Sequence, residues 1–156
     1  MENQKNPDII EAEKIFSKDK FATNQTEIKI QKITEETVQC GLTIQDKHRN
    51  AMGGVMGGVF FTLADFVFAI ATNYKKIPTV STSAQINFLG QPKGTQLFGE
   101  SVCIKDGKST CLYEVKITDE LGTKVALAVI NGMKLELRRG LPPFSPAWRD
   151  PYKRPF

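Results

Sequence analysis

Apolar and polar positions alternate along most of this chain, and the period of the alternation changes in one central segment. Nearly every residue between Gly57 and Asn73 is apolar or small, which predicts a helix that is buried on most sides. Because one face of any neighbouring strand must cover apolar surface, we expect an α+β fold in which an antiparallel sheet wraps around this helix. Runs with a period of two and many β-branched residues predict the strands, at 26–33, 37–44, 79–89, 95–104, 109–118 and 124–137.

The two ends of the chain have different patterns. Asn6-Pro7-Asp8, followed by apolar residues at helical spacing, predicts a short amphipathic helix over residues 7–18. Residues 140–156 contain five of the eight prolines and several spaced aromatic residues, which favours an extended segment lying against the domain or a neighbouring subunit. The chain therefore divides into an N-terminal helix and lead-in (1–24), a helix-and-sheet domain (25–139) and a C-terminal tail (140–156).

The bulk composition narrows the class of protein. A chain of 156 residues with 40% hydrophobic and 24% charged residues is typical of one globular domain with its own core. The net charge of +4 suits an anionic small molecule, but without a zinc-finger or RNP-like motif it does not indicate nucleic-acid binding. The most apolar window is shorter than a membrane span and the polar start lacks a signal-peptide apolar region, so we expect a cytoplasmic protein with no membrane partner.

The cysteines and the single histidine argue against a metal site and against disulfides. The three cysteines form no C-x-x-C pair and His48 is the only histidine, so no structural zinc site is expected. A two-residue turn at Asp106-Gly107 would place Cys103 opposite Thr110, one register step away from Cys111. We therefore expect reduced thiols and no metal cofactor.

A glycine-rich turn leads into the central helix and is a candidate for chemistry. A helix N-terminus that follows glycines presents unpaired backbone N–H groups and the positive end of the helix dipole. The Gly57 N–H is the best placed donor for a substrate carbonyl, and Gly58 would let that carbonyl approach the backbone. On composition alone, a plain tight turn into a closely packed helix is the simpler explanation of these glycines.

Asp65 is the only carboxylate in the apolar helix. Burial of an ionised carboxylate without partners is so costly that such a group shifts its pKa or has a functional partner. Asp65 is therefore a catalytic candidate, although a bond to a nearby hydroxyl or backbone amide would also account for it. It lies eight residues beyond Gly57, about 12 Å along a helix, which is too far for both to act on one carbonyl within a chain. This spacing predicts a twofold dimer with shared sites.

These residues also carry a family resemblance. Asn50, the pair Gly57-Gly58 and Leu63-Ala-Asp65 resemble the signature of hotdog-fold acyl-CoA thioesterases of the PaaI-like, phenylacetate-pathway type. The resemblance extends over about residues 25–137. It implies a long central helix wrapped by a five- or six-stranded antiparallel sheet, homodimers that often pair into homotetramers, and hydrolysis of acyl-CoA thioesters. Coenzyme A would enter as part of the substrate, and no separate cofactor is implied.

The resemblance also implies roles for single residues. Asp65 corresponds to the family's general base or nucleophile, and Gly57 to the backbone donor for the thioester carbonyl. Asn50 corresponds to an asparagine that polarises the carbonyl or positions water. Ser81 or Ser83 matches a serine that orients the water in some members, and an unbroken strand would place both serines on one side.

A second group of residues is implied to contact the coenzyme A portion. Gly107 and Lys108 fall near a segment that contacts the pantetheine or nucleotide part in relatives. On charge grounds alone, three other basic residues would pair with its phosphates, although a solvated surface explains them as well; these are Lys93, Arg138 and Arg139.

One position departs from the family pattern. Relatives usually have histidine directly before the two glycines, where this chain has Met56, and methionine can neither donate a hydrogen bond nor hold a proton. His48 lies eight positions upstream and does not fill that place by sequence. The alternative to an enzyme is therefore a non-catalytic acyl-CoA binder or sensor in which Met56 extends an apolar pocket. A hotdog dehydratase or hydratase is disfavoured, because such sites pair a histidine with an acid.

Overall fold

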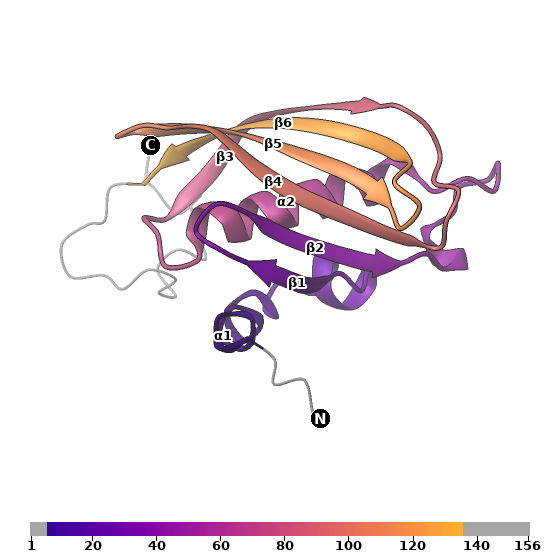
Figure 1. Cartoon of the computed structure of the whole chain (residues 1–156), viewed down its shortest axis with the longest axis horizontal. Helices are drawn as coiled ribbons and strands as arrows, with labels where there is room; N and C mark the ends of the chain where they lie inside the picture. The colour runs from indigo at the N-terminus through magenta and orange to yellow at the C-terminus, as the bar shows by residue number, and fades with distance from the viewer. Residues whose placement is uncertain (1–5, 136–156) are drawn as a thin grey trace, which may run out of the picture.

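The computed structural model describes residues 6–135 and confirms the α+β prediction of a sheet wrapped around one helix (Figure 1). Six antiparallel strands are arranged in the order β1-β2-β4-β5-β6-β3. The predicted tail 140–156 lies outside the described residues, as do Arg138 and Arg139. In chain order the elements are α1 (Pro7–Phe16), a π-helical turn η1 (Phe21–Gln25), β1 (Lys29–Ile33), β2 (Val38–Thr43), a 3-10 turn η2 (Asp46–His48), α2 (Gly57–Asn73), β3 (Thr79–Phe88), β4 (Gln96–Asp106), β5 (Thr110–Asp119) and β6 (Lys124–Lys134).

The central helix α2 packs into the sheet through a close apolar core. Gly99 of β4 allows a close approach, since a Cβ atom there would lie 3.1 Å from the Leu63 side chain and 3.2 Å from that of Val67. This contact explains why a glycine interrupts an otherwise regular strand. The most deeply buried residues of this core include Phe60, Leu63, Val67 and Ile70 of α2, and Leu97, Val115, Ile117 and Ile130 of the strands.

The helix is less enclosed than its sequence predicts. One stripe along α2 is uncovered, on which Phe61 and Asp65 are exposed and Thr62 and Ala69 are half-buried. The sheet and the N-terminal helix α1 (Pro7–Phe16) cover the other faces, and the two free edges of the sheet, β1 and β3, lie on either side of the helix (Figure 1). The expectation that Asp65 is buried within its own chain is therefore wrong.

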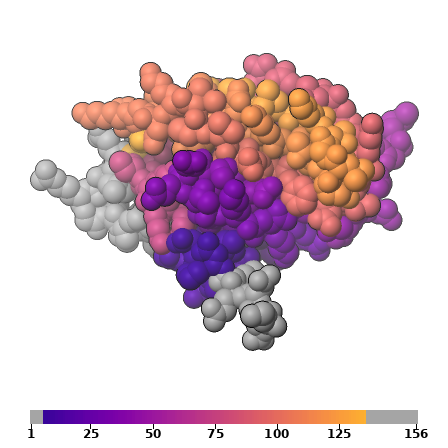
Figure 2. All heavy atoms as spheres, viewed as in Figure 1, coloured from indigo at the N-terminus to yellow at the C-terminus, as the bar shows by residue number. Residues whose placement is uncertain are grey.

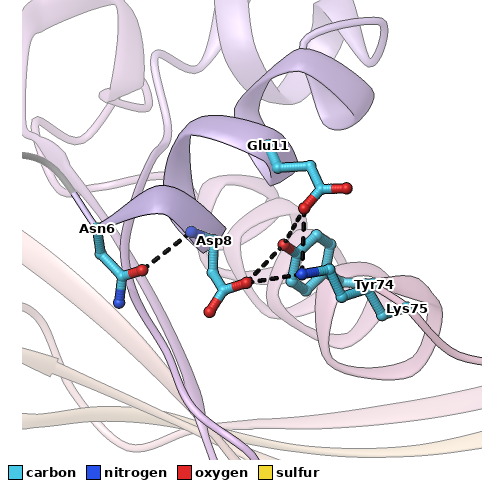
Figure 3. Close-up of polar contacts among 5 residues, drawn as sticks. All are labelled: Asn6, Asp8, Glu11, Tyr74 and Lys75. Carbon is cyan, nitrogen blue, oxygen red and sulfur yellow. Dashed lines mark hydrogen bonds and ion pairs between the residues drawn. The ribbon is translucent and has the colours of Figure 1, made fainter.

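The N-terminal helix α1 packs beside β1 and the end of α2. The space-filling view shows it directly under β1 and β2 (Figure 2). Asn6 caps it, with Oδ1 accepting from the Asp8 N–H (2.9 Å), and its buried face includes Phe16, whose ring meets that of Phe66 edge-on. Figure 3 shows the polar side of this contact, in which Asp8 and Glu11 both bind the Tyr74 hydroxyl and the Lys75 ammonium group.

A bulge in β3 changes the faces on which its serines lie. The pairing with β6 shifts between Ser81 and Ser83, so that Ser81 lies opposite Gly132 and Ser83 opposite the adjacent Asn131. Directly opposed residues share a face of the sheet and successive residues do not. Ser81 and Ser83 therefore point to opposite faces, and the prediction that they share a side is wrong because alternation along a sequence does not reveal a bulge.

The β4–β5 hairpin turns later than predicted. Its turn is closed by the Gly107 N–H donating to the Thr110 carbonyl (2.9 Å), so Cys103 lies opposite Tyr113 and not opposite Thr110 as expected. A bulge between Cys103 and Lys105 also shifts the register within this strand pair. All three cysteines are free thiols, as expected.

Candidate functional site

The segment between β2 and α2 forms a short hairpin that carries Asn50. The Met56 N–H donates to the His48 carbonyl (2.9 Å), and Arg49 and Val55 form an antiparallel bridge. The Gln91 side chain brackets Val55, because its Oε1 accepts from the Val55 N–H (2.7 Å) and its Nε2 donates to the Val55 carbonyl (3.2 Å). The chain therefore enters α2 from a fixed position. We call residues 48–56 the Asn50 hairpin.

Asn50 lies at the exposed tip of this hairpin with one polar atom free. Its backbone N–H donates to the Gly54 carbonyl (2.8 Å), and its side-chain Oδ1 accepts from the Met52 N–H (2.9 Å). Gly53 closes the tip with a φ of 83°, a conformation that favours glycine. The Nδ2 amide has no acceptor within the described part of the chain, so it remains available to donate to a ligand.

The first turn of α2 offers two backbone donors. Met56 is the N-cap residue and provides no side-chain cap, while its carbonyl accepts from the Val59 N–H (2.9 Å). Among residues 6–135, neither the Gly57 N–H nor the Gly58 N–H has an acceptor. Because the positive end of the helix dipole lies at the same place, this turn is suited to stabilise negative charge that develops on an oxygen.

Apolar side chains flank these donors. A Cβ atom on Gly57 would lie 2.9 Å from the Phe88 ring, and one on Gly58 would lie 2.5 Å from the Met56 methyl carbon. Phe88 and Met56 are themselves 58% and 52% exposed, so both present apolar surface to whatever occupies the turn. Phe88 was not identified from the sequence. The available signal was its position at the end of the strand that follows α2, which returns to the N-terminal end of the helix.

Asp65 projects from the uncovered stripe of α2. Its carboxylate has no hydrogen bond or ion pair within the described residues, so the alternative of a carboxylate bonded to a hydroxyl or an amide does not hold for the single chain. Partial desolvation and the negative charge of Asp19 both raise the pKa of Asp65. Asp19 is held at the start of η1, where its Oδ1 accepts from the Ala22 N–H (3.0 Å). A raised pKa makes Asp65 a better proton acceptor than an ordinary surface aspartate.

The predicted site residues do not meet within one chain. Gly57 and Asp65 are more than two helical turns apart on α2, a separation of about 12 Å along the helix axis. Ser83 lies on the outer face, where its Oγ accepts from the Asn131 amide (3.0 Å). Ser81 shares the inner face with Gly132, which lies against Phe68 of α2, so it is the serine on the helix side of the sheet.

The predicted CoA-contacting turn lies at the other end of the molecule. The Gly107 carbonyl accepts from the Lys134 ammonium group (2.7 Å), and neighbouring Asp106 lines a cavity together with Tyr74, just beyond the end of α2. Lys108 is exposed at the tip of this turn. Within one chain the turn is therefore at the opposite end of α2 from Gly57.

The two edges of the sheet differ in chemistry. The β3 edge carries no charged residue, and almost all of its side chains are exposed, including Val80 and Phe88. The β1 edge carries Lys29 and Lys32, has a bulge between Ile30 and Lys32, and lies against α1. Lysines, bulges and covering helices are the usual devices that prevent edge pairing, so β3 is the edge on which a further strand can add.

In the part of the chain that the structure describes, no three His, Cys, Asp or Glu side chains come together as a potential metal site. None of the described helices is both long enough and apolar enough to cross a membrane.

Comparisons with known proteins identify relatives of this arrangement. The family model "Thioesterase superfamily" matches residues 52–126, a range that includes Met56, the two glycines, Asp65 and both serines. A putative esterase of Archaeoglobus fulgidus is 25% identical over 118 residues, which is 75% of this chain and 75% of that protein.

Solved structures agree with the fold. The E. coli PaaI protein from the phenylacetic acid degradation operon superposes with a TM-score of 0.75 at 22% identity, over 83% of this chain and 94% of that one. A hypothetical thioesterase of Streptococcus pneumoniae TIGR4, solved with coenzyme A, superposes with a TM-score of 0.72 at 24% identity, over 81% of this chain and 98% of that one. The fold is thus the hotdog fold that the sequence resemblance implied.

Proposed function

We propose that this chain is a PaaI-like protein of the thioesterase superfamily and hydrolyses acyl-CoA thioesters to the free acid and coenzyme A. The observation that carries the proposal is the open first turn of α2, where the Gly57 and Gly58 N–H groups have no acceptor among residues 6–135. The coenzyme A bound to the Streptococcus pneumoniae thioesterase supports an acyl-CoA ligand. A cytoplasmic location stays a prediction.

In the proposed reaction, the Gly57 N–H and the Asn50 Nδ2 donate to the thioester carbonyl. Asp65 removes a proton from a water molecule, and the water oxygen bonds to the carbonyl carbon. The negative charge that develops on the carbonyl oxygen is stabilised by the two donors. The C–S bond then breaks, and CoA leaves as a thiolate, which needs no strong general acid. Direct attack by the Asp65 carboxylate, followed by hydrolysis of the anhydride, uses the same groups.

The proposed site is shared between two subunits. Pairing of the β3 edges of two chains about a twofold axis would continue the sheet and cover the exposed stripe of α2. The antiparallel arrangement would then place the first turn of one helix near Asp65 of the partner subunit. Ser81, on the helix side of β3, is the serine proposed to orient the water. Gly107 and Lys108, distant from Gly57 in one chain, would approach the substrate only across the same interface.

Mixing two inactive variants tests the shared site. Asp65→Asn removes the base and leaves Gly57 intact, whereas Gly57→Ala displaces the carbonyl donor and leaves Asp65 intact. Each mixed dimer would contain one site with both groups intact and one with neither. Co-expression in equal amounts is therefore expected to restore about one quarter of wild-type activity, because half of the dimers are mixed and each has one working site. Activity that stays at the level of the single variants would contradict a shared site.

The competing function is an acyl-CoA binder without turnover. The observation that favours it is Met56, whose thioether lies over Gly58 at the place where relatives usually have histidine. Titration calorimetry with a CoA thioester and its stable ether analogue, beside a free-thiol assay, separates the two functions. Tight binding of both compounds with no release of thiol would support the binder. A large gain in rate for Met56→His would show a competent site that lacks one group.

A further inference from the structure

His48 has a buried polar atom that no part of the proposed site explains. Its side chain is 2% exposed, and among residues 6–135 its Nε2 is the one fully buried side-chain nitrogen or oxygen atom without a hydrogen-bond partner. Its Nδ1 accepts from the Gln45 N–H (3.1 Å). An accepting Nδ1 carries no proton, so the neutral ring holds its proton on Nε2.

This ring lies at the base of the Asn50 hairpin, where the hairpin begins. Gln45 and His48 cap each other across η2, since the Gln45 side chain accepts from the His48 N–H while the His48 ring accepts from the Gln45 N–H. The His48 carbonyl accepts from the Met56 N–H (2.9 Å), which joins the two strands of the hairpin. Asn50 follows two residues after His48, and Gly57 follows directly after Met56. The ring therefore fixes the point from which both proposed donors extend.

The surroundings of the ring favour its neutral form. Burial and the charge of Lys47 lower the pKa of His48. The Thr26 backbone beside the ring and the charge of Glu27 act in the opposite direction, although the Thr26 backbone does not form a hydrogen bond of good geometry with Nε2. Glu27 is not free to pair with the ring, because it binds the Gln45 amide and the Lys47 ammonium group (3.2 Å). A protonated ring would lose its bond from Gln45 and bring a charge into a buried position.

We infer that His48 is a positioning residue for the proposed thioesterase, whose neutral ring locks the base of the Asn50 hairpin and thereby places Asn50 and the Gly57 N–H at one carbonyl. The inference rests on the proposed function. His48 does not replace the histidine missing at Met56, since its ring is enclosed and its Nδ1 is occupied. It acts on the reaction only through the backbone that it holds.

Two substitutions separate the acceptor from the bulk of the ring. His48→Asn keeps an oxygen near the position of Nδ1, whereas His48→Phe fills the space without any acceptor. We expect His48→Phe to accelerate hydrogen exchange at the Asn50 and Met56 amides and to lower kcat by about 10-fold or more with a smaller change in KM. His48→Asn is expected to be closer to wild type in both amide exchange and kcat. Ile117→Val is the matched control, because it loosens the core without a change at the hairpin.

The pH dependence of the wild-type chain gives a test that needs no variant. Since the pKa of His48 is lowered by folding, its contribution is present above the unfolded pKa of about 6.5 and is lost as pH falls through the folded value. Exchange at Asn50 and Met56, corrected for intrinsic rates, should therefore rise relative to the core strands as pH falls. This rise should be absent in His48→Asn.

The outcomes distinguish this inference from the proposed function. Unchanged local protection in His48→Phe, together with no pH-dependent loosening in the wild type, would overturn the role of His48. Faster hydrogen exchange at the Asn50 and Met56 amides in His48→Phe, with an unchanged kcat, would confirm that His48 holds the Asn50 hairpin. The same result would show that Asn50 and Gly57 take no part in the proposed reaction.

Discussion

The two ends of helix α2 differ in whether their terminal backbone groups have hydrogen-bond partners. At the N-terminal end, Met56 gives no side-chain cap, and the Gly57 and Gly58 N–H groups find no acceptor among residues 6–135. At the C-terminal end, the Tyr74 N–H donates to the Ile70 carbonyl (2.9 Å), and the Lys76 ammonium group donates to the Ala71 carbonyl (2.8 Å). One end is therefore open to a ligand and the other is closed by the chain itself.

The same contrast holds for the neighbouring elements. The closed end is joined to β3, because Asn73 donates to the Thr79 carbonyl (3.1 Å) and accepts from the Thr79 N–H (2.8 Å), and to α1 through Tyr74 and Lys75 (Figure 3). The open end is flanked by exposed Met56 and Phe88, which bring no polar group to the donors. Substitutions at the open end should therefore change activity, and substitutions at the closed end should change stability.

The largest effect is expected for Asp65→Asn. Asparagine keeps the size of the side chain but cannot accept the proton of water, so kcat/KM should fall by about 10²–10⁴-fold with little change in thermal stability. In the wild type, activity should fall as pH drops through the raised pKa of Asp65, because only the ionised carboxylate is a base. Steady-state assays over pH check both points. An unchanged rate in Asp65→Asn, with Glu36→Gln as the charge control, would exclude Asp65 from the reaction.

Gly57→Ala should have the next largest effect. The N–H group remains, but the new methyl group would lie 2.9 Å from the Phe88 ring, so the ring or the helix end must move. A displacement of this size at a donor is expected to lower kcat/KM by up to about 10²-fold. Gly90→Ala is the matched control, since a Cβ atom there would meet nothing within 4 Å. Adding Phe88→Ala to Gly57→Ala should recover activity; if it does not, the clash is not the cause.

At the closed end, Asn73→Ala should destabilise the fold and leave the site intact. Its side chain makes hydrogen bonds to Ala69 and to both backbone groups of Thr79, and their loss should cost about 2–3 kcal/mol in the free energy of unfolding. Urea unfolding measures this cost, and kcat/KM at a temperature well below the transition should be unchanged. Asn24→Ala, an exposed asparagine of η1, is the control. A loss of activity without a loss of stability would reverse the assignment of the two ends.

The sequence was sufficient for the fold because its periodicity is strong. The apolar run 57–73 and the six alternating segments predicted α2 and the six strands with small errors at their ends. It could not predict the π-helical turn Phe21–Gln25, which has no distinct pattern, or the bulges in β3 and β4. A bulge shifts the register by one residue, so Ser81 and Ser83 face opposite sides although alternation places them together.

The candidate site was only partly predictable. Gly57 and Asn50 were identified from spacing and resemblance, and the structure leaves both with free donors. The burial of Asp65 was predicted wrongly, because a run of apolar residues does not reveal which face of a helix the chain itself leaves uncovered. The position of Phe88 beside Gly57 depends on tertiary packing. His48 is instead held by a local contact with Gln45, three residues before it, which the presence of a single histidine in a loop does not reveal.

The smallest effect is expected at Lys75, which binds Asp8 (2.8 Å) and Glu11 (3.1 Å) at the surface and has a left-handed backbone with φ of 53°. Lys75→Met removes both ion pairs and should lower the melting temperature slightly, because exposed pairs contribute little. Lys75→Gly removes the same pairs but suits the left-handed backbone, so it should be the more stable variant.

Salt and pH then identify the cause of the Lys75 effect. The Lys75 ammonium group lowers the pKa of both Asp8 and Glu11, so the stability that these pairs contribute is present above the ordinary carboxylate range and is lost as pH falls through the lowered values. The difference between wild type and Lys75→Met should therefore shrink in high salt and below about pH 4. A difference that persists under both conditions would mean that Lys75 contributes through the contact of its ammonium group with the Tyr74 ring (5.0 Å to the ring centroid) and not through the two ion pairs.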